Sequence, residues 1–130
     1  MRRRTFILVA IIAILLVLTV SGRLFMQATE TNLENLRTTR LQDIQLATLS
    51  DGSYGGAYSC FPIAVELEVQ VQDHRIADIR LLKHRNGQGK AAEAILPLVV
   101  AKQSLQLDAI SGATYSSIVI LKAIEAALQP

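Results

Sequence analysis

Residues Ile63–Gln72 read IAVELEVQVQ, and apolar side chains occupy every second position of this segment. A period of two residues is typical of a β-strand with one buried side and one solvent-facing side. Residues 73–75 provide a short polar connection, and the alternation resumes over residues 77–81. A connection this short joins antiparallel neighbours, so the sequence predicts a long β-hairpin.

The segments on either side of the hairpin carry weaker signals. Residues 51–56, DGSYGG, are rich in turn-forming residues, so we expect a turn there and then a short strand over residues 57–59. After the hairpin, residues 85–89 predict a flexible loop. Pro97 fits only the first turn of a helix, so residues 91–103 predict two short helices, the second beginning at Pro97.

The end of the chain has the period of an amphipathic helix, from about residue 115 to residue 128. Its apolar stripe consists of Ile118, Leu121, Ile124, Ala127 and Leu128. We expect Lys122 and Glu125 on the exposed side, and Thr114 as the N-cap. Strands followed by helices predict an α+β fold: a small antiparallel sheet with a long hairpin, short helices, and a C-terminal helix packed on the sheet.

The N-terminus predicts a transmembrane helix ahead of this fold. Residues 5–22 carry no charge, and 18 residues at the helical rise span about 27 Å, close to the thickness of a bilayer core. Arg2, Arg3 and Arg4 precede the run, so the positive-inside rule keeps the N-terminus in the cytoplasm and the rest of the chain outside the cytoplasmic membrane. A cleaved signal peptide that ends near Ser21 and Gly22 is the alternative.

The chain therefore divides into three parts. Residues 1–26 form the anchor or signal segment, residues 27–50 an amphipathic stalk, and residues 51–130 a globular domain. Leu33, Leu36, Leu41 and Ile44 lie at roughly helical spacing in the stalk. The stalk is a spacer helix, a weak dimer seam, or a helix that packs on its own domain.

Charge and cysteine content exclude several classes of function. The net charge is +2, but three of the thirteen basic residues are the N-terminal arginines, which leaves ten against eleven acidic residues. Nothing in this balance indicates nucleic-acid binding. Cys60 is the only cysteine, so the chain has no internal disulfide and no cysteine-based metal site.

Small and hydroxyl-bearing residues gather just before the C-terminal helix, where residues 108–117 read DAISGATYSS. Backbone N–H groups at the start of a helix, next to serine and threonine hydroxyls, favour an anion such as a phosphate. A threonine hydroxyl is a poor nucleophile without a base, and no histidine lies within nine residues of Thr114. We therefore expect no catalytic residue here, and read Thr114 as the target of another enzyme.

Residues 108–116 closely resemble the D-x-x-[ST]-G-A-T-x-[ST] motif of FMN-binding domains. Residues 51–56 resemble the opening D-G-x-Y-x-G of that family, and residues 69–79 resemble its hairpin. The family occurs in flavoprotein subunits of sodium-pumping and Rnf-type respiratory complexes and in small exported electron-transfer proteins. His74 stands where the family commonly has glycine, so we expect a different turn type in the hairpin.

The resemblance implies that Thr114 carries FMN through a phosphoester bond, attached by a flavin transferase that uses FAD and Mg²⁺. It implies a recognition and phosphate-side shell made of Asp108, Ser111, Gly112, Ala113 and Ser117. The N–H groups around Tyr115 and Ser116 would face the phosphate. Tyr54, in the D-G-x-Y element, would line the flavin, with an ordinary core tyrosine as the alternative.

We therefore expect an exported, membrane-anchored flavoprotein that passes electrons between an unidentified donor and an unidentified acceptor. No Rossmann G-x-G-x-x-G and no second cofactor motif is present in the sequence. Two alternatives remain at this point. One is a module that binds FMN or another phosphate ligand without a covalent bond, and the other is a membrane-tethered structural domain without a cofactor.

Overall fold

The computed structural model describes residues 2–42, 44–85 and 89–129. The chain forms two compact units, Met1–Asn32 and Leu33–Pro130. The first unit is helical throughout its described residues and belongs to α1 (Arg2–Thr38). Its large apolar side chains, from Phe6 to Met26, are exposed. Among the described residues, α1 is long and apolar enough to cross a membrane, which is compatible with a single-pass anchor.

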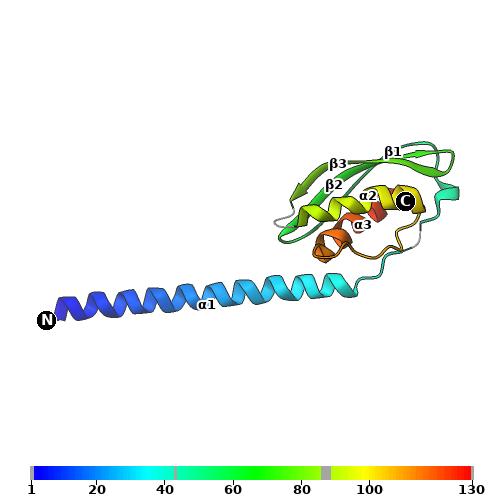
Figure 1. The fold of residues 1–130 in the computed structure, drawn as a ribbon. Coiled ribbons are helices and arrows are strands. Elements are labelled where there is room, and N and C mark those ends of the chain that lie inside the picture. The colour runs from blue at the N-terminus through cyan, green and yellow to red at the C-terminus, as the bar shows by residue number, and fades with distance from the viewer. Residues whose placement is uncertain (1, 43, 86–88, 130) are drawn as a thin grey trace. The chain divides into compact units, whose positions relative to one another are not determined.

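The second unit contains the predicted antiparallel sheet. Its three strands are β1 (Gly52–Cys60), β2 (Ile63–Gln72) and β3 (Arg75–Arg85), in the order β1-β2-β3. The alternation along β2 is confirmed, because its odd-numbered residues are buried and its even-numbered residues are more exposed. The predicted long hairpin is β2 and β3, which follow each other in the sheet (Figure 1).

The turn of this hairpin has two residues in left-handed conformation, Asp73 at φ 51° and His74 at φ 57°. Two consecutive positive φ angles are typical of a type I′ turn, which matches the twist of the strands. The Oδ1 atom of Asp51 accepts a hydrogen bond from the Asp73 N–H at 2.8 Å, and His74 Nδ1 lies 3.0 Å from the Leu49 carbonyl oxygen. His74 thus takes the conformation that glycine usually supplies.

Two predictions about the strands were wrong. Residues 52–56 belong to β1 and pair with β2 along their whole length, although their composition predicts a turn. Ala77 is exposed and Ile76 is buried, because an irregularity in the β2–β3 register shifts the alternation by one residue. The apolar residue next to the turn therefore takes the buried position.

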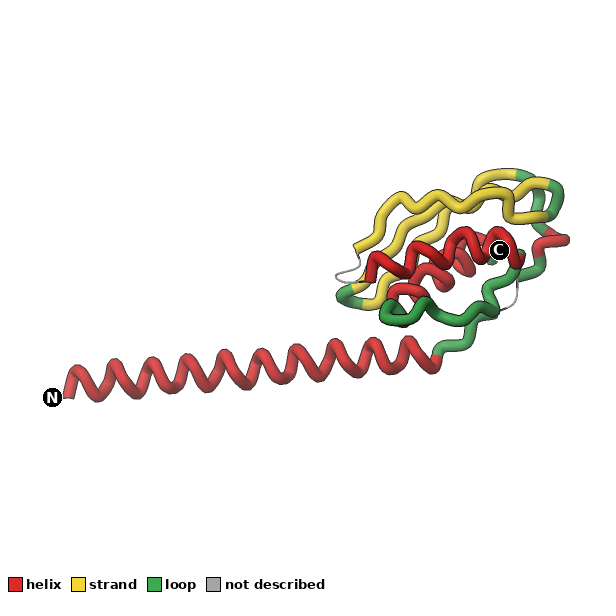
Figure 2. The backbone as a smooth tube through the Cα atoms, viewed as in Figure 1, coloured by secondary structure: helices red, strands yellow, loops and turns green. Residues whose placement is uncertain are grey.

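Helices cover one face of the sheet, as Figures 1 and 2 show. They are the 3₁₀ helix η2 (Gly89–Ala94), α2 (Ile95–Lys102) and α3 (Thr114–Leu128). α2 begins at Ile95, two residues before the predicted start at Pro97, so Pro97 lies in its first turn. The short helix ahead of α2 is a 3₁₀ helix. Together with the C-terminal position of α3, this arrangement confirms the α+β class.

The stalk residues of the second unit contact the domain. Leu36 is 3% exposed and belongs to the core, and Leu33, Leu41 and Ile44 are half-buried against it. These contacts favour the alternative in which this part of the stalk packs on its own domain. A short 3₁₀ helix, η1 (Leu46–Thr48), then leads to β1.

Lys122 and Glu125 were predicted to be exposed, and this was wrong. Lys122 Nζ lies 2.6 Å from Glu125 Oε2, and their side chains are 13% and 7% exposed. Glu125 Oε1 accepts the Gln42 N–H at 2.5 Å, and Lys122 Nζ donates to the Arg40 carbonyl at 3.0 Å. The ion pair is buried because residues 40–42 cover this side of α3.

The outer face of the sheet, opposite α3, carries cross-strand ion pairs. Glu66 lies 3.2 Å from Lys83, and Glu68 lies 2.9 Å from Arg80. The pKa of Glu68 is held below its ordinary value, mainly by a hydrogen bond from the Ser53 side chain and also by the charge of Arg80. Solvent screens cross-strand pairs of this kind, so they contribute little to the stability of the domain.

Candidate functional site

The segment before α3 ends in a tight turn. The Ala113 N–H donates to the Ile110 carbonyl at 2.9 Å, and Gly112 has φ 78°. A positive φ at the third residue defines a type II turn and favours glycine there. A Cβ atom on Gly112 would meet nothing within 4 Å, so the position requires glycine for its conformation and not for space.

Ser117 fastens this turn to the helix. Its Oγ atom accepts the Ile110 N–H at 3.0 Å and donates to the Ala113 carbonyl at 2.9 Å. The side chain is fully buried. The Ser117 hydroxyl therefore donates and accepts within the domain, and it joins the turn to α3.

The N-terminus of α3 is open to solvent. Ala113 is the N-cap, at φ −137°, and no side chain of the described residues caps this end. The prediction that Thr114 is the N-cap was wrong: Thr114 is the first helical residue, and it is exposed. The N–H groups of residues 114–116 precede the first intrahelical bond, from Ser117 to Ala113, so by position they have no acceptor within the helix.

The remaining predicted site residues fall into three groups. Ser111 and Gly112 are exposed in the turn directly before Thr114, and Asp108 is exposed in the loop ahead of that turn. Tyr115 is half-buried against the core. Ala113 and Ser116 are buried, so only their backbone groups can contribute to a site.

Tyr54 lies away from this group. At Gly56, β1 lies directly against α3, because a Cβ atom there would clash with the Ala123 carbonyl and come within 2.6 Å of the Ala127 side chain. Tyr54 lies beyond Gly56, toward the end of the helix far from Thr114, and its hydroxyl donates to the Ser50 carbonyl at 2.7 Å. The structure does not bring Tyr54 to Thr114.

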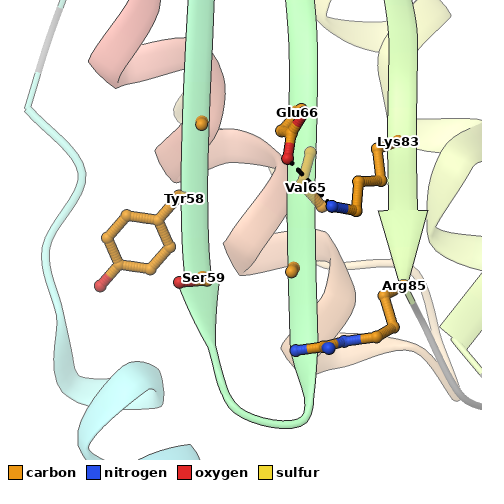
Figure 3. Close-up of a pocket in the computed structure, with 8 residues that line it drawn as sticks. Tyr58, Ser59, Val65, Glu66, Lys83 and Arg85 are labelled. Atoms are coloured by element: carbon orange, nitrogen blue, oxygen red, sulfur yellow. Dashed lines mark hydrogen bonds and ion pairs between the residues drawn. The ribbon is translucent and has the colours of Figure 1, made fainter.

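An open groove lies on the outer face of the sheet, with a volume of about 490 Å³. Small side chains of β1 and β2 form its floor, and Lys83 and Arg85 border it on β3 (Figure 3). Arg85 reaches toward the β1–β2 turn, where its Nε donates to the Pro62 carbonyl at 3.1 Å. The residues that line this groove are Ala57, Tyr58, Ser59, Ala64, Val65, Glu66, Lys83 and Arg85.

Sequence reasoning missed two residues near this turn. Arg85 was assigned to a flexible loop but is the last residue of β3, and its guanidinium lies 5.9 Å from the centroid of the Phe61 ring. Phe61 is 50% exposed, although large apolar residues in a small domain are usually buried. His84 also differs from a surface residue at a strand end: its side chain is 3% exposed, and its Nδ1 lies 2.9 Å from Glu93 Oε1.

The open helix end fits an anionic group next to Thr114. N–H groups of the first helical turn point away from the helix, and the helix dipole favours negative charge there. The threonine hydroxyl is exposed beside them, and Gly112 places no side chain in the way. The residues present therefore suit a phosphate bonded to Thr114.

Comparison with known proteins agrees with this geometry. The family model described as FMN-binding domain matches residues 61–129, which include β2, β3, the turn at Gly112 and all of α3. No curated protein matches the chain. The match covers more than half of the chain and supports FMN as its cofactor, so the protein is an FMN-binding flavoprotein module and belongs to the FMN-binding domain family.

Proposed function

We propose that this protein is a membrane-anchored electron carrier whose FMN is joined to Thr114 through a phosphoester. The observation that carries the proposal is the exposed Thr114 hydroxyl at the uncapped start of α3, within the segment matched by the FMN-binding domain model. Bound FMN would supply redox chemistry that no amino-acid side chain provides. The protein would hold it, orient it and set its potential.

A separate flavin transferase forms the bond in this proposal. The two histidines are engaged elsewhere, His74 near the Leu49 carbonyl and His84 with Glu93, and Asp108 lies six residues before Thr114. Thr114 Oγ would attack the FMN-side phosphorus of FAD. The new P–O bond would replace the bond to the departing AMP, and the hydroxyl proton would pass to a base of the transferase. Mg²⁺ would neutralise charge on the pyrophosphate.

The residues around Thr114 have distinct tasks in this scheme. Gly112 shapes the turn that presents the threonine, and Ser117 holds that turn against α3. The phosphodiester keeps one negative charge. The N–H groups of residues 114–116 would face that charge and stabilise it by about 0.3–1 kcal/mol at an exposed helix end.

Export follows from the N-terminus in this proposal. Arg2, Arg3 and Arg4 precede the apolar run, which would keep that end in the cytoplasm and place residues 51–130 outside. The flavin would then accept electrons from a donor and pass them to an acceptor at the outer surface of the cytoplasmic membrane. A protease added to intact spheroplasts should degrade the domain, and a domain protected until lysis would contradict this orientation.

The covalent bond is tested by intact mass. The full chain, co-expressed with a flavin transferase and purified in detergent, should gain about 438 Da, the mass of FMN less one water. Thr114→Val should lack the gain, and Ser116→Ala should keep it. Unshifted protein with yellow colour released by acid would show non-covalent binding instead, and colourless protein would indicate a structural domain.

A further inference from the structure

Phe61 is the one phenylalanine or tyrosine that is exposed among the described residues of the second unit. Phe61 is 50% exposed in the β1–β2 turn, whereas Tyr54, Tyr58 and Tyr115 are half-buried against the core. Aromatic residues, phenylalanine among them, are enriched where protein surfaces contact a partner. In the described part of this unit, the other exposed large apolar residues are Leu82 and Leu98.

Arg85 differs from its neighbours on the same strand. Arg80 and Lys83 each face a carboxylate across the sheet, at 2.9 and 3.2 Å. Within the described part of the chain, Arg85 forms no ion pair; it bonds the Pro62 carbonyl through Nε and lies over the Phe61 ring. The charge of this guanidinium is therefore left for another partner, while its position is fixed by the turn.

The β1–β2 turn and the start of α3 lie at the same end of the domain. From Gly56, where the strand meets Ala123, β1 runs four residues to Cys60, about 13 Å at the strand rise. From Ala123 back to Thr114 is nine residues, about 13.5 Å at the helical rise. Figures 1 and 3 both show these two segments running toward the end where β3 also stops. The β1–β2 turn, the end of β3 and the start of α3 are thus at one end of the domain.

We propose that Phe61 and Arg85 form the surface against which the isoalloxazine ring of the Thr114-linked FMN lies, and that Arg85 raises the reduction potential of the flavin. This rests on the proposed function, since the five-carbon ribityl chain extends from the phosphate on Thr114. Phe61 offers a planar apolar contact for the ring. Reduction at neutral pH takes up two electrons from the donor and one proton, and it leaves one negative charge on the ring, which a nearby guanidinium favours.

A measurement of the flavin reduction potential tests the role of Arg85. The full chain, flavinylated by co-expression and held in detergent, is titrated with dithionite while flavin absorbance is recorded. Arg85→Gln should lower the equilibrium constant for reduction by about tenfold, which equals about 30 mV for a two-electron couple. Arg85→Lys keeps the positive charge, so its equilibrium constant for reduction should stay close to that of the wild-type protein. Lys83→Gln is the matched control and should change the constant less than twofold.

Iodide quenching of flavin fluorescence tests the role of Phe61. Phe61→Ala should at least double the quenching constant, because one face of the ring becomes open to solvent, and Phe61→Leu should give an intermediate value. Leu98→Ala, at another exposed apolar residue, should leave it unchanged. Unchanged potential and quenching in the Arg85 and Phe61 variants, with the adduct intact by mass, would overturn this inference alone. A wild-type chain without the adduct would overturn the proposed function as well.

Discussion

The two ends of α3 have opposite environments. At its start, Thr114 is exposed, the helix is uncapped, and a glycine turn precedes it. In its second half, Gly56 of β1 lies against Ala123 and Ala127, and the buried Lys122–Glu125 pair holds residues 40–42. The contacts of the far end fix the helix in the domain, and the near end leaves Thr114 exposed.

The largest expected effect is at Gly56. A valine side chain there would clash with the backbone of α3, so Gly56→Val should lower the free energy of unfolding by more than about 3 kcal/mol. Gly55→Val is the control, because a Cβ atom at Gly55 meets nothing within 4 Å. Denaturation by urea in detergent, followed by tyrosine fluorescence, measures both, since all three tyrosines lie in the second unit. An equal loss of stability in the two variants would show that the close contact between Gly56 and α3 does not stabilise the domain.

The next effect is at Glu125. Glu125→Ala should cost about 2–3 kcal/mol, because it leaves the Lys122 ammonium 13% exposed without its carboxylate. Glu34 and Arg37 form an ion pair of the same i,i+3 spacing with side chains 65% and 56% exposed. Glu34→Ala should therefore cost less than about 0.5 kcal/mol in the same urea titration. A Glu125 effect as small as that of Glu34 would show that the pair does not stabilise the domain.

A smaller loss of stability is expected where the turn joins α3. Ser117→Ala removes two hydrogen bonds, to the Ile110 N–H and the Ala113 carbonyl, and should cost about 1–2 kcal/mol. It should also raise the rate of hydrogen exchange at the Ile110 amide. Ser111→Ala, at an exposed position in the same turn, should change neither quantity. If the two variants behave alike, Ser117 does not fasten the turn.

The smallest effect on stability is at Gly112. Alanine at φ 78° is strained, so Gly112→Ala should cost about 1 kcal/mol and reduce the yield of flavinylated protein. Gly112→Asn should recover part of both losses, since asparagine tolerates the left-handed region better than alanine does. Intact mass gives the modified fraction. Full modification of the alanine variant would mean that the transferase does not depend on this turn.

Periodicity in the sequence was sufficient to predict the hairpin, the C-terminal helix and the α+β class. Periodicity does not predict contacts between residues that are far apart in the sequence. Residues 52–56 have turn composition, but pairing with β2 places them in a strand, where Gly56 permits the approach of α3. Lys122 and Glu125 read as an exposed pair because residues 40–42, which bury them, are some 80 positions away.

The candidate site was predicted in part. The exposed Thr114 and the glycine turn agree with the local sequence, because such a turn depends on residues adjacent to one another. The structural role of Ser117 could not be read from the sequence, since it depends on how the turn folds back. Phe61 and Arg85 come together only through the pairing of β1, β2 and β3.

Peptide-level mass spectrometry tests the central claim most directly. Trypsin should release residues 103–122, which contain Thr114 together with Ser104, Ser111, Tyr115, Ser116 and Ser117. In protein co-expressed with a flavin transferase, this peptide should carry about 438 Da, and fragmentation should place the added mass on Thr114. Flavin on a neighbouring hydroxyl, or an unmodified peptide in fully active co-expression, would contradict the account.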